Sequence, residues 1–338
     1  MAHKILITGA SGFIGSFMTE HALAKNWDVW AAIRPTSSRE YLNDERIHFI
    51  ELNLGSDSEL KTQLLEHVAT YGHFDYVIHA AGATKCRCND DFFAINTEGT
   101  TRLALTLMET GALTPQGRLV FISTLSVYGP IHEIDRRPIR EGDPLMPNTA
   151  YGQSKLQAEK RLAEIPGLNY IILRPTGVYG PRERDYLMMA QSISWHVDFA
   201  VGFKPQVLTF VYVADLVDAA FLALEHGQSG RAYAITDGRS YTSRAFSNLL
   251  QLELGVKHVC HITAPLWFLK GVCWTAEHIA RLTGKVPTLN SDKYRIMSQR
   301  NWECDIRPAR QELGYAPQWP LTRGVRTAVS WYRQAGWL

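Results

Sequence analysis

Tyr151 and Lys155 carry the clearest chemical signal in this chain, in the stretch Ala150-Tyr151-Gly152-Gln153-Ser154-Lys155. Positions four apart on a helix share a face, so the phenol and the ammonium would point into the same space. A nearby cation favours the phenolate, and it would lower the pKa of Tyr151 from its ordinary value of about 10. We therefore expect Tyr151 to exchange a proton at working pH. Taken alone, such a pair more often consists of two solvent-exposed residues on a helix face. Other residues of the chain are therefore needed to decide whether this pair is catalytic.

A glycine-rich turn near the N-terminus predicts a second site. It follows the apolar run Lys4–Thr8 and precedes a helical pattern over Phe13–Lys25. Glycines leave room for backbone N–H groups to approach a phosphate, and the helix N-terminus adds free donors and a positive dipole end. Spacing of this kind is typical of a dinucleotide site, with an ordinary strand–helix turn as the alternative. The residues expected to bind the dinucleotide here are Gly9, Ser11, Gly12, Phe13, Ile14 and Gly15.

The end of the second expected strand, Val29–Ile33, indicates which dinucleotide binds. An acidic residue roughly 20 positions after the glycines would hold the ribose 2′-hydroxyl of NAD. This chain has Arg34 there instead, and Ser37, Ser38 and Arg39 follow. Two cations and two hydroxyls suit the 2′-phosphate of NADP, so we expect NADP in preference to NAD. The alternative is that Arg34 is simply a surface residue after a strand.

Composition and charge narrow the function classes. The chain has 338 residues, of which 46% are apolar, and 35 basic against 33 acidic residues leave a net charge of +2. This balance is too near neutral to indicate a nucleic-acid partner. The start of the chain has no signal-peptide pattern, and the most apolar segment, 264–280, contains Lys270, Glu277 and His278, so we expect no membrane span. These features predict a soluble cytoplasmic protein.

The cysteines do not suggest a metal. They are five in number and scattered, at Cys86, Cys88, Cys260, Cys273 and Cys304. A single closely spaced pair without a second pair lacks the ligand set of a zinc site. We expect free thiols in a reducing compartment and no metal centre.

The first half of the chain alternates short apolar runs with helical patterns. This alternation predicts a doubly wound parallel sheet (Rossmann fold), with ligands at the carboxyl ends of the strands. We expect strands at Lys4–Thr8, Val29–Ile33, His48–Leu52, Tyr76–His79, Arg118–Ile122 and Tyr170–Leu173. We expect helices at Phe13–Lys25, Glu59–Tyr71, Asn89–Gly111 and Tyr151–Ile165.

After Pro175 the alternation weakens. Thr209–Val213 is expected to be a strand that returns to the sheet, followed by a helix over Val213–Leu224 and a short strand at Ala232–Ile235. From about Asp237 the chain is expected to be irregular, until an amphipathic helix in the tail, Thr322–Leu338, closes the second unit. We therefore predict a cofactor-binding domain of residues 1–174 and 208–236, and a substrate-binding domain of residues 175–207 and 237–338.

Six motifs in fixed order resemble the extended short-chain dehydrogenase/reductases, the NAD(P)-dependent epimerase/dehydratase superfamily, along nearly the whole chain. The first three are Thr8-Gly9-x-x-Gly12-Phe13-x-Gly15, His79-Ala80-Ala81-Gly82 and Asn96-Thr97-x-Gly99-Thr100. The others are Ser123-Thr124-Leu125-Ser126-Val127-Tyr128-Gly129, Tyr151-x-x-Ser154-Lys155 and Leu173-Arg174-Pro175-x-x-Val178-Tyr179-Gly180-Pro181.

The resemblance implies roles for individual residues. Thr124 would polarise the substrate oxygen, Tyr151 would transfer the proton, and Lys155 would bind the nicotinamide ribose while acidifying Tyr151. Asn96 would support the relay through Lys155. The other positions implied at the cofactor are Ala80, Ala81, Gly82, Ser123, Pro175 and Val178, and those implied at the substrate are Thr84, Ser126 and Tyr179.

The sequence indicates less clearly which reaction of the family this chain catalyses. Dehydratases of the family carry Asp-Glu after the catalytic Thr, where this chain has Leu125-Ser126. Nucleotide-sugar epimerases usually carry an Arg where this chain has Leu208, although Arg182, Arg184 or Lys204 could substitute. The remaining resemblance is to the branch of 3β-hydroxysteroid dehydrogenase-like and dihydroflavonol reductase-like enzymes, to which the segments 180–185 and 265–269 are similar. It implies an oxidoreductase acting on a secondary alcohol or ketone, with a nucleotide-sugar epimerase as the alternative.

Several aromatic residues of the second unit could wall an apolar substrate pocket. They are Trp195, Phe199, Phe203, Trp267, Phe268 and Trp274, and ordinary core packing would explain them equally well. A non-catalytic NADP sensor or scaffold is a further alternative, although such proteins generally lose a catalytic residue. The resemblance also implies a homodimer through two helices, with Ala104, Leu105, Leu107, Ala158 and Leu162 as contact or core residues.

Overall fold

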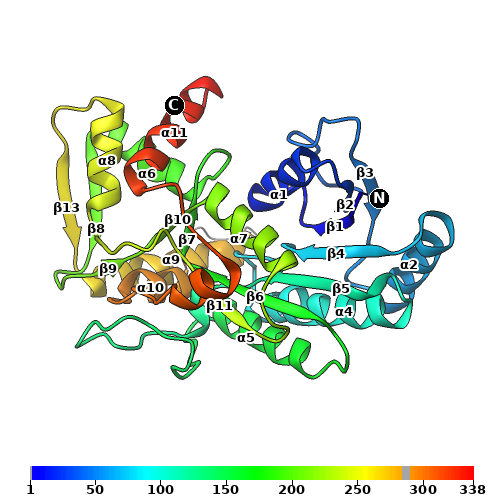
Figure 1. The fold of residues 1–338 in the computed structure, drawn as a ribbon. Helices are drawn as coiled ribbons and strands as arrows, with labels where there is room; N and C mark the ends of the chain where they lie inside the picture. The colour runs from blue at the N-terminus through cyan, green and yellow to red at the C-terminus, as the bar shows by residue number, and fades with distance from the viewer. Residues whose placement is uncertain (1, 284–289) are drawn as a thin grey trace.

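A seven-stranded parallel sheet forms the centre of the protein (Figure 1). The computed structural model describes residues 2–283 and 290–338. The strand order is β11-β6-β5-β4-β1-β2-β3, and all neighbouring strands are parallel. The strands are β1 Lys4–Thr8, β2 Asp28–Ile33, β3 His48–Glu51, β4 Phe74–His79, β5 Leu113–Ile122, β6 Tyr170–Pro175 and β11 Ala232–Ile235. The order reverses between β1 and β4, which places a ligand crevice outside their carboxyl ends.

Helices cover both faces of the sheet, as the alternation of strands and helices predicts. In β1 the side chains of Ile5 and Ile7 join one core cluster and that of Leu6 joins the other, because successive strand residues point to opposite faces. The first cluster lies under α1 Phe13–Ala24 and α7 Val213–Glu225. The second lies under α2 Asp57–Tyr71, α4 Gly99–Glu109 and α5 Ala150–Ala163. The doubly wound fold is thus confirmed.

One expected strand pairs elsewhere. Residues Phe210–Tyr212 form β10, which pairs with β7 Gly177–Tyr179 in a separate two-stranded sheet and does not return to the central one. The edge place beside β6 is taken instead by β11, the expected short strand Ala232–Ile235, which completes the seven strands.

The described residues after Asp237 form helices and strands, so the expectation of irregular structure is wrong for them. Strand β13 Cys260–Ala264, for example, forms by pairing with β8 Val197–Val201, which lies far away in the sequence, so no local pattern reveals it. The elements after Asp237 include β12 Tyr241–Thr242, α8 Ala245–Leu254, β13 Cys260–Ala264, α9 Leu266–Thr283, α10 Ser291–Ser298 and α11 Leu321–Gln334, and they join α6 Asp185–Ser194, β8 Val197–Val201 and β9 Val207–Leu208 from the segment after Pro175. The amphipathic tail helix α11 packs on α8, as expected. No helix in the described part of the chain has the length and apolar character needed to cross a bilayer.

Candidate active site

In the glycine-rich turn, neighbouring backbone atoms leave no room for a side chain at two positions, Gly9 and Gly15. Gly9 has φ +71, and a Cβ there would lie 2.7 Å from the backbone N of Ala81. A Cβ on Gly15 would lie 2.1 Å from the carbonyl oxygen of Gly9, so α1 can approach β1 only because this position is glycine. Gly12 precedes α1 without a capping side chain. The first N–H groups of the helix therefore remain available to an anionic ligand.

The carboxyl end of β4 faces this turn. His79 is buried, and its ring contacts the Thr8 hydroxyl at 2.6 Å and the Thr100 hydroxyl at 2.8 Å. Burial lowers the pKa of His79 to about 3, so the ring is neutral and acts as a structural link between β1, β4 and α4. The same Thr8 hydroxyl accepts a hydrogen bond from the backbone N–H of Ala81. These bonds fix the backbone of residues 80–82 beside the glycine-rich turn.

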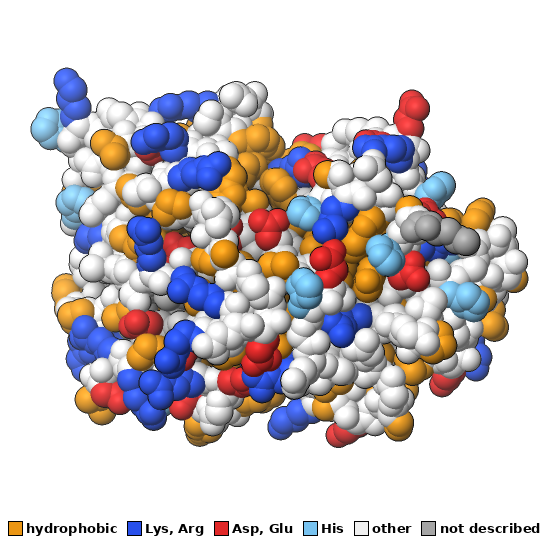
Figure 2. Space-filling model, viewed as in Figure 1, with side chains coloured by type: hydrophobic (Ala, Val, Ile, Leu, Met, Phe, Trp, Pro, Cys, Tyr) orange, Lys and Arg blue, Asp and Glu red, His pale blue; other side chains and the backbone are white. Residues whose placement is uncertain are grey.

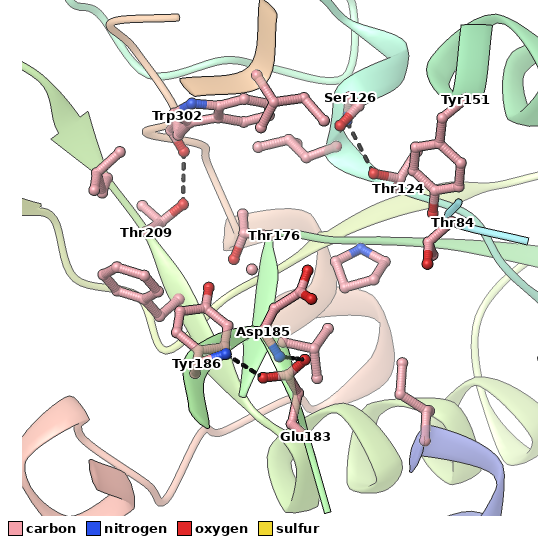
Figure 3. Close-up of a pocket in the computed structure, with 18 of the residues that line it drawn as sticks. Thr84, Thr124, Ser126, Tyr151, Thr176, Glu183, Asp185, Tyr186, Thr209 and Trp302 are labelled. Atoms are coloured by element: carbon pink, nitrogen blue, oxygen red, sulfur yellow. Dashed lines mark hydrogen bonds between the residues drawn. The ribbon is translucent and has the colours of Figure 1, made fainter. Parts of the chain in front are cut away.

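Tyr151, Thr124 and Ser126 come together although they belong to separate elements. Tyr151 lies on the first turn of α5, while Thr124 follows the end of β5 and caps the short 3₁₀ turn Leu125–Val127. Figure 3 shows the ring hydroxyl of Tyr151 pointing to the space beside Thr124 and Thr84. The Thr124 oxygen accepts a hydrogen bond from the backbone N–H of Ser126 at 3.2 Å. The sequence prediction that a phenol and a hydroxyl meet here agrees with this geometry.

The pKa of Tyr151 is shifted in the opposite direction to the one expected. Burial raises the pKa of Tyr151 to about 12, and a hydrogen bond with Thr124 only partly opposes this shift. Burial also lowers the pKa of Lys155 to about 7, against the influence of Glu159, which raises it. Without a bound cofactor, Tyr151 is therefore a protonated phenol at neutral pH. In this state it is ready to donate a proton.

Lys155 and Asn96 are close neighbours behind Tyr151. A Cβ on Gly82 would lie 3.0 Å from Asn96 Oδ1 and 3.6 Å from Lys155 Nζ. The Lys155 ammonium also lies 4.2 Å from the centre of the Phe121 ring. Asn96 is fully buried in a π-helical turn, Phe93–Glu98, a distortion that is frequent at functional sites. Its amide donates to Ala83 O and Ser154 Oγ, both at 3.0 Å, so it fixes α5 against the backbone near Gly82.

A cavity of about 700 Å³ joins these parts and continues toward the second half of the chain. Twelve of the residues expected at the cofactor line it: Gly9, Gly12, Phe13, Ile14, Gly15, Ala80, Gly82, Ser123, Tyr151, Lys155, Pro175 and Val178. Thr84, Thr124 and Ser126 line it as well. Ser11, Arg34, Ala81 and Asn96 lie outside its lining.

Tyr179 was expected to contact the substrate, and the structure places it elsewhere. It is 1% exposed, and its ring packs edge-on against Phe210, Tyr212 and Phe246. Residues of a strand alternate in direction, and Tyr179 points from β7 into the core while Val178 faces the cavity. We therefore do not retain it as a substrate-binding residue.

Apart from Phe199 and Leu208, the far end of the cavity is built by residues that the sequence analysis did not single out. The residues of this end are mainly apolar: Tyr186, Met189, Phe199, Leu208, Phe210, Phe246, Ile296, Met297 and Trp302. They come from α6, β8, β9, β10, α8, α10 and the loop after α10. No local pattern in the sequence links these segments, because they meet only through tertiary contacts.

Charged side chains in the described cavity lining are few. Beside Lys155 there are two carboxylates, Glu183 and Asp185, and no arginine. Glu183 accepts backbone N–H bonds from Asp185 at 2.7 Å and from Tyr186 at 2.6 Å, which the dashed lines in Figure 3 mark. Asp185 is engaged by the ammonium groups of Lys85 at 2.6 Å and Lys293 at 3.2 Å.

The basic residues that could have replaced the missing arginine lie elsewhere. Arg182 binds Ser16 Oγ at 2.9 Å and Glu20 Oε1 at 2.6 Å, beside α1. Arg184 stacks over the Trp337 ring at 5.0 Å, and Lys204 is exposed on the surface. None of the three lines the cavity.

The expected aromatic wall is also corrected. Of the six aromatic residues named from the sequence, only Phe199 lines the cavity. All six have more than half of their surface exposed, from 52% at Phe268 to 76% at Phe203. The cavity is instead walled by buried or half-buried aromatic residues of other elements.

The turn, the helix N-terminus and the residues of β4 fit a dinucleotide, because backbone N–H groups lie where only glycine allows close approach. A dinucleotide cradle on a doubly wound sheet, with Tyr, Lys and Thr at its inner end, defines a nicotinamide-dependent oxidoreductase-type enzyme. The family model "NAD dependent epimerase/dehydratase family" matches residues 5–236, and this chain belongs to that family. It is an NAD(P)-dependent enzyme of the extended short-chain dehydrogenase/reductase type.

Relatives cover the whole chain at low identity. A UDP-glucose 4-epimerase of Vibrio cholerae is 25% identical, over 99% of this chain and 97% of the relative. A 4-hydroxy-2-methyl-3-oxo-4-farnesyl-3,4-dihydroquinoline-1-oxide ketoreductase of Stigmatella aurantiaca is 26% identical, over 98% and 96%. The fold is similar to that of a UDP-glucose 4-epimerase from Thermotoga maritima solved with UDP-glucose, with a TM-score of 0.78, 23% identity and coverage of 98% and 99%.

Proposed function

We propose that this enzyme transfers a hydride reversibly between NADP(H) and a secondary alcohol or ketone of apolar character. The observation that carries this proposal is the far end of the cavity, where apolar side chains predominate and Lys155 is the single cation in the described lining. A sugar diphosphate brings two negative charges, and their burial beside Glu183 and Asp185 without an arginine would be costly. An apolar ketone needs only a donor for its oxygen.

The residues at the inner end of the cavity supply that donor. In the reducing direction the ketone carbon gains the hydride and its oxygen gains the Tyr151 proton, so a C=O bond becomes a secondary alcohol. The Thr124 hydroxyl orients the same oxygen. When bound, the nicotinamide supplies or accepts the hydride. Lys155 lies where it can hold the nicotinamide ribose and return a proton to Tyr151, and Asn96 positions Lys155 through Ala83 and Ser154.

Net consumption of reduced cofactor tests the reaction type. The purified chain should oxidise NADPH in the presence of apolar ketones, and Tyr151→Phe should abolish turnover while cofactor binding stays nearly unchanged. Loss of a positioned acid of this kind typically costs on the order of 10²–10⁴ in rate. If the Phe variant retains turnover, Tyr151 is not the acid.

A nucleotide-sugar epimerase is the second candidate, because several relatives carry that activity in their names. An epimerase returns its hydride to the substrate and causes no net change in cofactor redox state. Conversion of a UDP-hexose without NADPH consumption would favour it over the ketone reductase. A non-catalytic sensor is disfavoured because Asn96, Thr124, Tyr151 and Lys155 are all in place.

The preference for NADP over NAD rests on Arg34 and Arg39. Both are exposed beyond the carboxyl end of β2, and neither makes an ion pair with the described residues. The Arg39 guanidinium lies over the Phe49 ring, 4.2 Å from its centre, and this contact with a ring leaves its charge available to a phosphate. Arg34→Ala should raise the KM for NADPH more than the KM for NADH. A tenfold preference of the wild type for NAD would refute this argument.

We also propose the two-part division of the chain, a homodimer and a cytoplasmic location. The two-part division is supported by the cavity, which residues of both parts line. The cytoplasmic location is supported by the five free cysteines. The helix α4 exposes Leu105 and Met108, whereas Ala104, Leu107, Ala158 and Leu162 are core residues and cannot form a dimer contact. Sedimentation showing only monomer at micromolar concentration would exclude the dimer.

A further inference from the structure

Six exposed aromatic residues lie on neighbouring segments of the second half of the chain, and one of them, Phe199, also lines the cavity. This aromatic surface consists of Trp195, Phe199 and Phe203 in and around β8, and of Trp267, Phe268 and Trp274 on α9. These segments touch: β8 pairs with β13, and a Cβ on Gly202 would lie 3.6 Å from the Leu266 side chain at the start of α9. Exposed apolar clusters of this size on a monomer usually mark an interaction site.

The two faces of the β8–β13 pair differ sharply. On one face Asp198 is 4% exposed and binds Arg244, His261 and Ser247, which ties the strands to α8. On the other face Phe199 lies beside Ile262 in register, and these side chains are 62% and 39% exposed. The apolar face therefore has no covering element among the described residues. In Figure 1 this strand pair forms the edge of the molecule farthest from β1–β3.

The start of α9 continues the surface with interfacial residue types. Leu269 and Cys273 point into the protein, at 7% and 1% exposure. On the outside Trp267 and Trp274, seven positions apart, lie on one face with Lys270 between them. Tryptophan and lysine side by side are typical of the membrane–water boundary, where the ring sits at the headgroup level and the ammonium meets lipid phosphate.

The exposed charges on this surface are all positive. Within residues 195–206 and 257–276 the exposed charges are Lys204, Lys257 and Lys270, and the single carboxylate, Asp198, is buried and paired. Figure 2 shows apolar side chains reaching the surface between basic ones along the left edge, where β8 and β13 lie. A second copy of this chain would bring the same lysines against one another, since a two-fold contact is self-complementary. An anionic lipid surface can accommodate the aromatic rings at the headgroup level and also attract the lysine ammonium groups.

We propose that this aromatic surface docks the enzyme peripherally on an anionic lipid bilayer. Phe199 lines the cavity and also lies on the docking surface, so the cavity opens where the lipid would be. An apolar substrate that partitions into the bilayer then reaches the cavity without crossing water. The docking rests on the surface residues alone and does not depend on the reaction proposed above.

Co-sedimentation of the full chain with vesicles tests the proposal. Vesicles of phosphatidylcholine containing roughly one third phosphatidylglycerol should bind the protein, pure phosphatidylcholine should bind it much less, and high salt should release it. The double variant Trp267→Ser/Trp274→Ser should bind at least about tenfold more weakly. The charge-reversal variant Lys204→Glu/Lys257→Glu/Lys270→Glu should lose its preference for the anionic vesicles.

Leu65→Ser provides the matched control, because Leu65 is 48% exposed on α2 and lies in the cofactor-binding part of the chain. It should bind vesicles as the wild type does. Circular dichroism and turnover with a water-soluble ketone should be unchanged in all variants, since none of these residues lines the cavity. Equal vesicle binding by wild type and the Trp double variant would overturn the proposal. So would self-association of the wild type that the same two substitutions abolish, because the surface would then join two copies of the chain.

Discussion

The carboxylate of Asp292 accepts a hydrogen bond from the backbone N–H of Tyr151 at 3.1 Å. Its other oxygen accepts the N–H of Ala150, also at 3.1 Å, and the Thr149 hydroxyl accepts that of Gly152 at 3.0 Å. The first turn of α5 is thus capped by a residue from α10, about 140 positions away. The same helix α10 supplies Ile296 and Met297 to the cavity wall. A ligand that touched α10 in the cavity would therefore be linked mechanically to Tyr151, the proposed proton donor.

Asp292→Ala should lower both stability and turnover. Two N–H groups would lose their acceptor, and loss of such a cap costs roughly 1 kcal/mol. Denaturant unfolding and kcat measure the two effects. Asp292→Asn keeps an oxygen acceptor and should fall between the Ala variant and the wild type. An Ala variant with unchanged kcat would show that the cap does not position Tyr151.

Removal of one partner of the buried Arg174–Glu159 pair should destabilise the fold strongly. The guanidinium and carboxylate meet at 2.6 Å, both residues are at most 5% exposed, and Arg174 also donates to Tyr128 at 2.8 Å. Arg174→Met or Glu159→Leu alone should cost about 3–5 kcal/mol, because a buried charge is left unpaired.

The double variant Arg174→Met/Glu159→Leu is the control for that experiment. It removes both charges and should cost clearly less than the sum of the single changes, as urea unfolding of all four proteins would show. Simple additivity would mean that the pair is not coupled in the folded state.

The stability of the cofactor-free chain should rise with pH above neutrality. Lys155 has a pKa of about 7 in the folded protein, below the ordinary value of 10.5, so between these pH values the unfolded chain binds more protons. Unfolding then becomes less favourable as pH rises, and this group adds about 2 kcal/mol of stability from pH ~7 to ~9. Lys155→Met should lose this increment. Thermal melts of both proteins over this range would check it, and parallel curves would contradict the assignment.

Gly15→Ala and Gly12→Ala should fail in different ways. A Cβ at Gly15 would lie 2.1 Å from the Gly9 carbonyl oxygen, so the Ala variant must push α1 off β1 and should unfold or melt much earlier. At Gly12 the nearest atom is 3.2 Å away, so the fold should survive. We expect the Gly12 variant to lose cofactor affinity in titration with little change in melting temperature. If both variants lost the same amount in melting temperature, the proposed difference between a packing role for Gly15 and a cofactor-binding role for Gly12 would be wrong.

Much of the fold and the inner site could be predicted because their signals are local. Strand β1 and the glycine turn adjoin in sequence, and Tyr151 and Lys155 lie one turn apart on one helix. The direction of the Tyr151 pKa shift could not be predicted in the same way, because burial is a property of all surrounding elements, and here it outweighs the hydrogen bond with Thr124.

Sequence alone determined the doubly wound sheet and the glycine-rich turn, since periodicity and spacing encode contacts between near neighbours, and the family resemblance of its motifs is the source of the proposed roles of Thr124, Tyr151 and Lys155. Tertiary structure alone decided that Tyr179 is core, that five of six aromatic residues lie outside the cavity, and that Asp292 caps the helix of Tyr151. Contacts between segments over a hundred residues apart depend on the packing of the whole chain, which no short pattern records.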